Sequence, residues 1–306
     1  PPLSYLDTFA LAGGTVSPDK SRYAVVSKNG VLEVFSLKKI QNGDAEPFFT
    51  TQNYPLTFSP DGQTFVALSD SLRVFRTDQW WQMLAARQTD SVAAVLAVGN
   101  HWVAHRSSPD SIELFHFDTR RHRRFEFASQ DNRYIPNTVT LSSDEQWFAY
   151  AAMGNEVVAV PLSDHKSLVR HTFESFVTGL VFVPNSTKIL VTVSIAGFYT
   201  SDQNIRLWDL SQPEKEPEPL LLPDFMVEGN PVFSPDGRWV ALSNATGSRV
   251  FDLNNLSEEY SFIHHHNILN ASVSAVSFSP DGQLLVLGYS DGHTVAWNIQ
   301  SRQVHY

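Results

Sequence analysis

The chain has 306 residues, 42% of them hydrophobic and 18% charged, which is typical of a globular protein with a sizeable core. No apolar run approaches the roughly 18 residues that a membrane helix needs. A formal net charge of −10 disfavours a surface that binds nucleic-acid phosphates, and the absence of cysteine excludes disulfides, thiolate metal sites and cysteine nucleophiles. A protein partner is therefore the default expectation.

A short turn sequence recurs along the chain. Ser59–Gly62, Ser234–Gly237 and Ser279–Gly282 each read Ser-Pro-Asp-Gly, and Ser17-Pro18-Asp19 is a partial copy. An apolar run begins six residues after each of these serines. Because proline fixes φ and glycine permits a left-handed backbone, the sequence predicts a tight reversal between two strands at each copy.

Two series of apolar residues extend this repeat over the chain. The first series, spaced 38 to 51 residues apart, is Tyr23, Phe65, Val103, Phe148, Ile189, Val240 and Leu285. The second series, which follows the first by 10 to 19 residues, is Phe35, Phe75, Phe115, Val160, Trp208, Phe251 and Trp297. The longest of these intervals marks an insertion at Ser194–Asn204. Runs such as Leu284–Leu287 are apolar at consecutive positions, which indicates strands buried on both faces.

A period of about 40 to 45 residues is typical of propeller blades. We therefore predict an all-β fold in which residues 1–306 form a single closed seven-bladed β-propeller of four-stranded antiparallel blades. The start at Pro1, without a methionine, indicates a piece trimmed from a longer chain rather than a processed product.

The repeat resembles the WD (Trp-Asp) repeat β-propeller family. The best single match is Asp202–Leu210, which reads Asp-Gln-Asn-Ile-Arg-Leu-Trp-Asp-Leu, and Trp297-Asn298 replaces the Trp-Asp pair in the last blade. The resemblance implies a hydrogen-bonded network in which Asp202 serves Trp208 and Asp291 serves Trp297. His171 and His264–His266 are loose counterparts of the histidine that completes this network in the family.

Ring closure requires a final strand, and both ends of the chain offer one. The candidates are Leu3–Phe9 and Gln303–Tyr306. The resemblance favours Leu3–Phe9, because such propellers commonly complete the last blade with the start of the chain.

No local signature of catalysis, of a phosphate-binding loop or of a metal site is present, so we expect no enzymatic activity, no cofactor and no metal. The leading hypothesis is a scaffold or sensor module that binds a protein or peptide on the narrower face and central opening, with other domains of the same chain as further partners. The alternative is an envelope propeller that binds or hydrolyses a small molecule. We expect the protein to be located in the cytoplasm. The sequence leaves a periplasmic or extracellular location open as the alternative.

Three short stretches are the predicted contacts with a partner on the narrower face. They are Phe198 and Tyr199 in the insertion, Arg133 and Tyr134 before the fourth blade, and His264 and His266 before the seventh. Exposed aromatic residues bring a large contact area at a small entropic cost. The alternatives are that the aromatic residues fold down onto the ring and that the histidines belong to a solvated loop.

One dense basic cluster stands out in this acidic chain. Its arginines are Arg120, Arg121, Arg123 and Arg124, between the predicted third and fourth strands of the third blade and thus on the wider face. The cluster predicts contact with an anion, either an acidic peptide, a phosphate or a nucleic acid. The alternative is a solvated turn before a strand that continues through Phe125 and Phe127.

Overall fold

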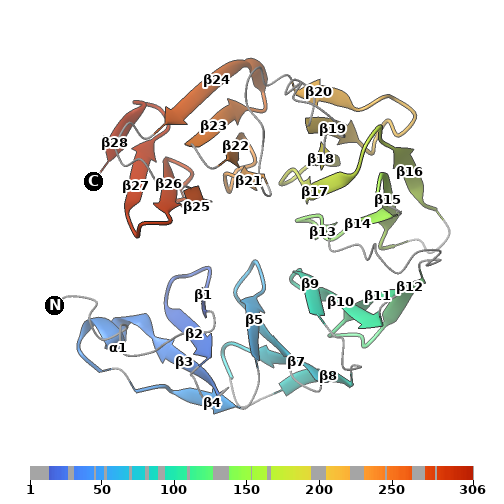
Figure 1. Ribbon diagram of the computed structural model, residues 1–306. Coiled ribbons are helices and arrows are strands. Elements are labelled where there is room, and N and C mark those ends of the chain that lie inside the picture. Colours follow the sequence, from blue (N-terminus) through green and yellow to red (C-terminus); the bar gives the residue numbers. More distant parts are fainter. Residues whose placement is uncertain are drawn as a thin grey trace. The chain divides into compact units, whose positions relative to one another are not determined.

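The chain divides into two compact units, residues 1–135 and residues 136–306, here called unit 1 and unit 2. The computed structural model describes residues 14–26, 31–44, 46–51, 54–68, 71–79, 83–88, 94–108, 111–126, 138–152, 154–163, 167–193, 205–220, 231–244, 247–263, 273–279 and 281–305. Apart from one short helix, the regular structure in these ranges is all β (Figure 1).

Unit 1 holds three four-stranded antiparallel sheets in which the strands follow chain order. The first sheet is β1 (Gly14–Val16), β2 (Arg22–Val26), β3 (Leu32–Ser36) and β4 (Phe49–Thr51). The second is β5 (Tyr54–Phe58), β6 (Thr64–Leu68), β7 (Ser71–Arg76) and β8 (Met83–Gln88). The third is β9 (Ala94–Val98), β10 (Trp102–Ser108), β11 (Ser111–His116) and β12 (His122–Glu126).

Unit 2 holds four sheets of the same kind. The fourth sheet is β13 (Val139–Leu141), β14 (Trp147–Ala152), β15 (Glu156–Pro161) and β16 (Val169–Thr172), and the fifth is β17 (Val177–Phe182), β18 (Lys188–Val193), β19 (Ile205–Asp209) and β20 (Glu218–Leu220). The sixth is β21 (Val232–Phe233), β22 (Trp239–Asn244), β23 (Gly247–Asp252) and β24 (Asn255–Ile263), and the seventh is β25 (Val273–Phe278), β26 (Leu284–Tyr289), β27 (Thr294–Asn298) and β28 (Gln303–His305).

The two series of apolar residues mark the second and third strands of every sheet. Each member of the first series lies directly opposite its partner in the second: Tyr23 and Phe35, Phe65 and Phe75, Val103 and Phe115, Phe148 and Val160, Ile189 and Trp208, Val240 and Phe251, Leu285 and Trp297. Directly opposed apolar side chains interact across the two strands and stabilise the sheet. The predicted repeat of seven four-stranded antiparallel sheets is confirmed.

Within each unit, neighbouring sheets share apolar cores. In unit 1, Phe58, Phe65 and Phe75 of the second sheet pack with Leu32 and Val34 of the first. The opposite face of the second sheet carries Val66, Leu72 and Val74, which pack against Val103 and Phe115 of the third. In unit 2, comparable clusters join the fourth sheet to the fifth, the fifth to the sixth and the sixth to the seventh. Burial of both faces is the packing expected of propeller blades.

In five of the seven sheets, the turn between the first and second strands is held by a serine and an aspartate two residues apart. In the second sheet, the Ser59 hydroxyl donates to Oδ1 of Asp61 at 2.6 Å and accepts the Thr64 N–H at 3.0 Å, while Asp61 Oδ1 accepts the Gln63 N–H at 2.9 Å. The same Ser-Asp hydrogen bond is made by Ser17 and Asp19, Ser142 and Asp144, Ser234 and Asp236, and Ser279 and Asp281. The predicted tight reversals are thus confirmed, and these side chains satisfy backbone groups of the turn.

These hydrogen bonds lower the pKa of two of the aspartates, Asp19 and Asp236. For Asp19, the Ser17 and Ser21 hydroxyls and the Ser21 N–H lower the pKa to about 2. For Asp236, the Ser234 hydroxyl lowers the pKa more than burial raises it. These two turns therefore favour the ionised form of Asp19 and Asp236.

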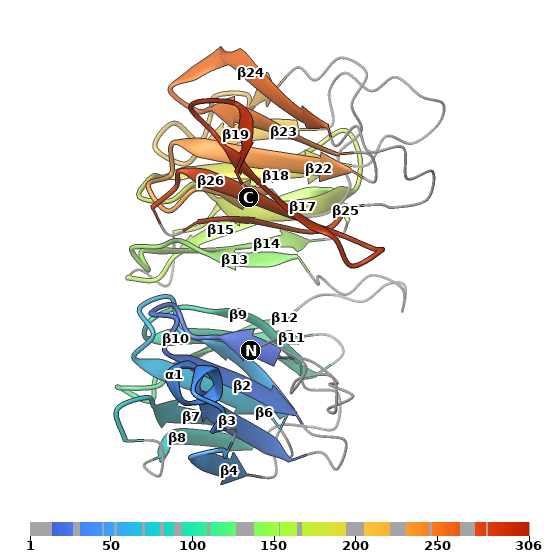
Figure 2. The same ribbon diagram turned by 90° about the vertical axis from the view of Figure 1, so that its left-hand side faces the viewer.

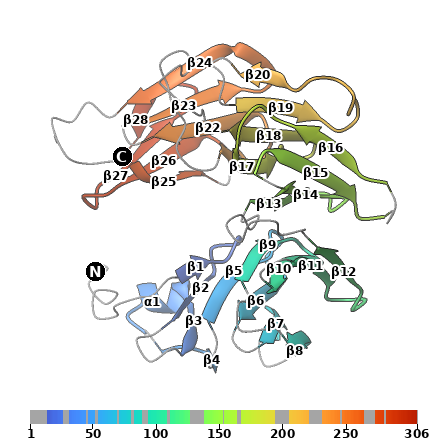
Figure 3. The same cartoon turned by 45° about the vertical axis from the view of Figure 1, so that its right-hand side comes forward.

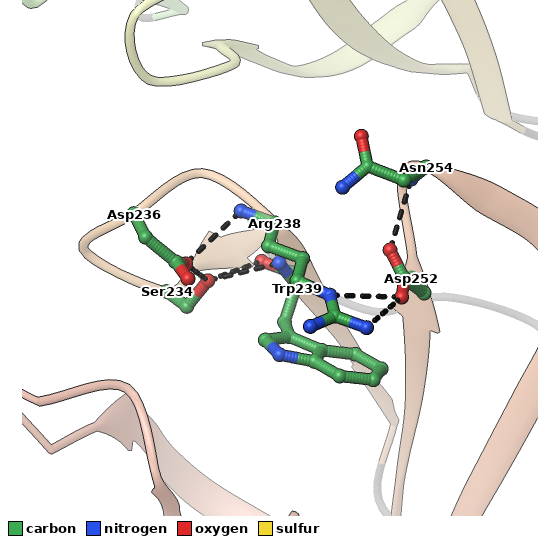
Figure 4. A network of polar contacts seen from close by, with 6 residues as sticks. All are labelled: Ser234, Asp236, Arg238, Trp239, Asp252 and Asn254. Atoms are coloured by element: carbon green, nitrogen blue, oxygen red, sulfur yellow. Dashed lines mark hydrogen bonds and ion pairs between the residues drawn. The ribbon is translucent and has the colours of Figure 1, made fainter.

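The sixth sheet adds an ion pair beside its turn (Figure 4). Arg238 donates from Nε and Nη2 to Oδ2 of Asp252 at 2.9 and 2.7 Å, and Asp252 Oδ1 accepts the Asn254 N–H at 2.9 Å. Burial alone would raise the pKa of Asp252, but these hydrogen bonds and the charge of Arg238 lower it overall. The Arg238 guanidinium also lies over the Trp239 ring at 4.8 Å.

Three features differ from the expectations or lie beyond them. A one-turn helix, α1 (Leu37–Gln41), follows β3 in the link to β4 (Figure 2). In the seventh sheet, the strand beside β27 is Gln303–His305, whereas Leu3–Phe9 lies outside the described residues. The structure shows seven propeller-like sheets, and their closure into one ring remains a prediction.

Among the described residues, no helix is long and apolar enough to cross a membrane.

Candidate interaction surfaces

The antiparallel strand order sorts the connecting segments onto two ends of each sheet. Turns between first and second strands, and between third and fourth strands, lie at one end, here called the Ser-Asp end. Turns between second and third strands, and links from one sheet to the next, lie at the other, here called the linker end. A partner bound at one end therefore contacts a different set of segments from a partner bound at the other.

The six predicted partner contacts belong to segments that lie outside the described residues. Phe198 and Tyr199 fall between β18 and β19, His264 and His266 between β24 and β25, and Arg133 and Tyr134 between β12 and β13. The flanking strands end and begin at the linker end of their sheets. The contacts of these six side chains stay predictions.

An exposed aromatic residue that the sequence prediction missed is described at the linker end. Phe176, in the link between β16 and β17, has 50% of its surface exposed. It precedes Val177, which pairs with Val193, the last residue of β18 before the segment that carries Phe198 and Tyr199. In the sequence, Phe176 directly follows the polar residues Glu174 and Ser175, and this position could have indicated an exposed aromatic side chain.

The predicted basic cluster lies at the Ser-Asp end of the third sheet, where β11 turns into β12 (Figure 3). Arg120 and Arg121 lie in the turn, whereas His122 opens β12, so Arg123 and Arg124 belong to the strand. The cluster is thus more than the turn before a strand, and we call Arg120–Arg124 the basic hairpin. Phe127 lies outside the described residues.

Each arginine of the basic hairpin has different surroundings. Arg120 has a φ of 57°, and its Nη2 donates to the Leu84 carbonyl oxygen of β8 at 3.2 Å. The Arg123 guanidinium lies over the Phe125 ring at 5.0 Å, and Arg124 Nε lies 3.4 Å from Glu126 Oε1. Arg121 is exposed, and no described carboxylate forms a salt bridge with it.

A group of rings borders the basic hairpin. The His116 ring packs edge-on against Trp102 with centroids 4.7 Å apart, and its centroid lies 5.8 Å from that of His101. His101 is half-exposed, and its Nε2 lies 3.8 Å from Asp118 Oδ2. No local spacing marks this group, because the turn between β9 and β10 and the end of β11 meet only in the folded sheet.

The hydrogen-bonded network implied for the tryptophans is largely absent from the described residues. In unit 2, the His171 ring on β16 lies 5.8 Å from the buried Trp208 ring of the next sheet and 4.7 Å, edge-on, from Phe173. Trp208 Nε1 has no hydrogen-bond partner among the described residues, and Asp202 lies outside them. Asp291 accepts the His293 N–H at 3.0 Å, and its Oδ2 lies 2.9 Å from His293 Nδ1.

Two cavities at the described surface are small. One of them, lined by Lys188, Asp209 and Lys215 among others, has a volume of about 160 Å³. Sites for drug-sized ligands usually enclose roughly 300 to 1,000 Å³. In the part of the chain that the structure describes, no group of three His, Asp or Glu side chains is placed to hold a metal ion.

Comparison with known families supports the repeat. The WD40 family model, described as "WD domain, G-beta repeat", matches residues 163–209 and 257–298. The matches end at the two pairs predicted from the sequence, Trp208-Asp209 and Trp297-Asn298. Two segments of the chain thus match the WD repeat.

The chain is also similar to a solved propeller. The crystal structure of the Myceliophteria thermophila Cps50 (Swd1) β-propeller domain matches it with a TM-score of 0.61 and 11% sequence identity, covering 94% of this chain and 95% of that one. At this identity the likeness concerns the fold alone. A comparison with curated proteins finds no match.

Proposed function

We propose that this WD-repeat chain is a non-catalytic interaction module, a scaffold or sensor that binds a protein or peptide at the linker end of its sheets. WD40 propellers are typically protein-interaction scaffolds. The proposal includes closure of the seven sheets into one ring, with the linker ends forming the narrower face around the central opening. The proposed compartment is the cytoplasm.

The observation that carries the proposal is the position of Phe176. Large apolar side chains are costly to leave in water, and an aromatic residue exposed at a loop is typical of a binding hot spot. Phe176 adjoins the start of the segment that carries Phe198 and Tyr199. These three residues are the proposed aromatic contacts with the partner.

The proposal is tested by affinity capture with the intact chain, Phe176→Ala, and the double substitution F198A/Y199A. Leu168→Ala is the matched control, because Leu168 has 46% of its surface exposed but lies at the Ser-Asp end of the neighbouring fourth sheet. We expect the same protein to be enriched by the intact chain and by Leu168→Ala, and to be reduced by at least about tenfold with the linker-end variants. Equal capture by all four proteins would refute the assignment.

A further inference from the structure

The basic hairpin is a second surface, at the opposite end of the sheets from the proposed partner site. Five residues in succession, Arg120–Arg124, are arginine or histidine in a chain whose net charge is −10. Such a local excess of positive charge attracts acidic groups over a distance set by the ionic strength. The charge alone does not distinguish a binding surface from a solvated turn, so the contacts of each arginine decide.

Two arginines of the turn are positioned without a described carboxylate partner. Arg120 is held by the neutral Leu84 carbonyl, which contacts one of its two terminal nitrogens. Arg121 forms no salt bridge with any described residue. By contrast, Arg76, in the same unit, donates from Nε and Nη2 to the two carboxylate oxygens of Asp78, each at 2.9 Å. Arg120 and Arg121 therefore keep N–H donors for an external anion, whereas the guanidinium of Arg76 is already paired with the Asp78 carboxylate.

The strand that continues from this turn is an edge. β12 pairs with β11 from Ser111 and Glu126 to Phe115 and His122, and no other described strand lies beside it. His122, Arg124 and Glu126 are exposed on one face of β12, where Glu126 pairs with Arg124 and leaves the turn arginines for an external carboxylate. An extended peptide can add to such an edge through backbone hydrogen bonds, with alternate side chains directed to the same face.

We propose that the basic hairpin binds an extended protein segment rich in Asp and Glu, which pairs along β12 and places carboxylates on Arg120 and Arg121. Guanidinium groups bind carboxylates through paired N–H···O bonds. An acidic protein segment fits the observations better than a nucleic acid, because the chain as a whole is strongly acidic and would repel a long phosphate backbone. This surface does not depend on the partner proposed for the linker end.

The test is fluorescence anisotropy with the full chain and a labelled peptide of alternating glutamate and serine, against a peptide of alternating glutamine and serine. We expect binding of the glutamate peptide, weaker binding as NaCl is raised, and no binding of the glutamine peptide. Arg121→Gln is the principal variant, since its side chain makes no described salt bridge, and R120Q/R121Q is the second. Each should raise Kd by about tenfold or more, because a charge-assisted hydrogen-bond pair is lost.

Arg76→Gln is the matched control, since it removes the same charge from the same end of unit 1, and it should leave Kd within about twofold. Circular dichroism melting checks that each variant is folded. Absence of binding of the glutamate peptide would overturn the proposal, and it is the result expected if the charges only protect the edge strand from pairing. An equal loss of affinity with Arg76→Gln would also overturn it. Binding of a phosphoserine peptide alone would overturn the carboxylate assignment, and tighter binding of single-stranded DNA that is lost with Arg121→Gln would overturn the assignment to a protein segment.

Discussion

A Cβ atom added to Gly237 would lie 2.7 Å from the carbonyl oxygen of Pro184. The turn of the sixth sheet therefore packs on the turn of the fifth at a distance that only glycine permits. Gly237 also has a φ of 71°, which disfavours any side chain. Close packing of successive turns is thus part of how neighbouring sheets stay together within unit 2.

Gly237→Ala should destabilise the protein by about 2 kcal/mol or more, because backbone strain and a clash with backbone act together. Gly43→Ala is the control, since Gly43 has a φ of 86° but no atom within 4 Å of an added Cβ. It should cost only about 1 kcal/mol. Thermal melting of both variants measures the difference, and equal melting temperatures would show that the contact with Pro184 is unimportant.

The pKa of Asp19 tests the Ser-Asp turn directly. A carboxyl titration followed by NMR should find a pKa of about 2. Ser17→Ala removes the largest contribution and should raise the pKa toward 3.8. Because the folded-state pKa lies below the unfolded value, this stabilisation is present above about pH 4 and is lost as the pH falls toward 2. An unchanged pKa in Ser17→Ala would contradict the hydrogen-bond explanation.

Arg238→Gln should destabilise the sixth sheet at neutral pH by about 1 to 2 kcal/mol, a value reduced from that of a fully buried pair because Arg238 is half-exposed. The pKa of Asp252 is lowered in the folded state, so the ion pair stabilises above the ordinary carboxyl pKa and its contribution is lost in acid. Melting curves of the variant and the original protein should converge at low pH. A constant gap between them would indicate that packing of Arg238 on Trp239 dominates.

The fold was largely predictable from the sequence, whereas the surfaces were only partly so. Ile189 and Trp208 lie opposite each other in the sheet, as do the other pairs of the two apolar series. The spacing of apolar residues in the sequence was therefore enough to predict the strands. The contact of Arg120 with Leu84 joins two sheets, and the contact of His101 with His116 joins two segments of one sheet. Neither contact corresponds to a regular spacing in the sequence, so neither could be predicted from it. The strand β20 lies within a Pro- and Glu-rich stretch whose composition is typical of a connector. It forms a strand because backbone pairing with β19 compensates for its weak strand propensity.

Trp208→Phe should cost about 1 to 2 kcal/mol, and Trp208→Ala about 3 to 5 kcal/mol. Phe251 occupies the equivalent position in the sixth sheet, so phenylalanine suits this register. Trp208 Nε1 has no hydrogen-bond partner among the described residues, so Phe should lose mainly packing volume. Denaturant unfolding measures both costs. A loss with Phe as large as that with Ala would imply a polar role for the indole.

Hydrogen–deuterium exchange of the protein with and without its captured partner tests the central claim, partner binding at the linker end. Binding should slow exchange in peptides that cover the link between β16 and β17, the segment between β18 and β19, and the segment between β24 and β25. The first-to-second-strand turns around Asp144, Asn185 and Asp236, at the Ser-Asp end, should exchange as before. Protection confined to those turns, with none at the linker end, would contradict the account.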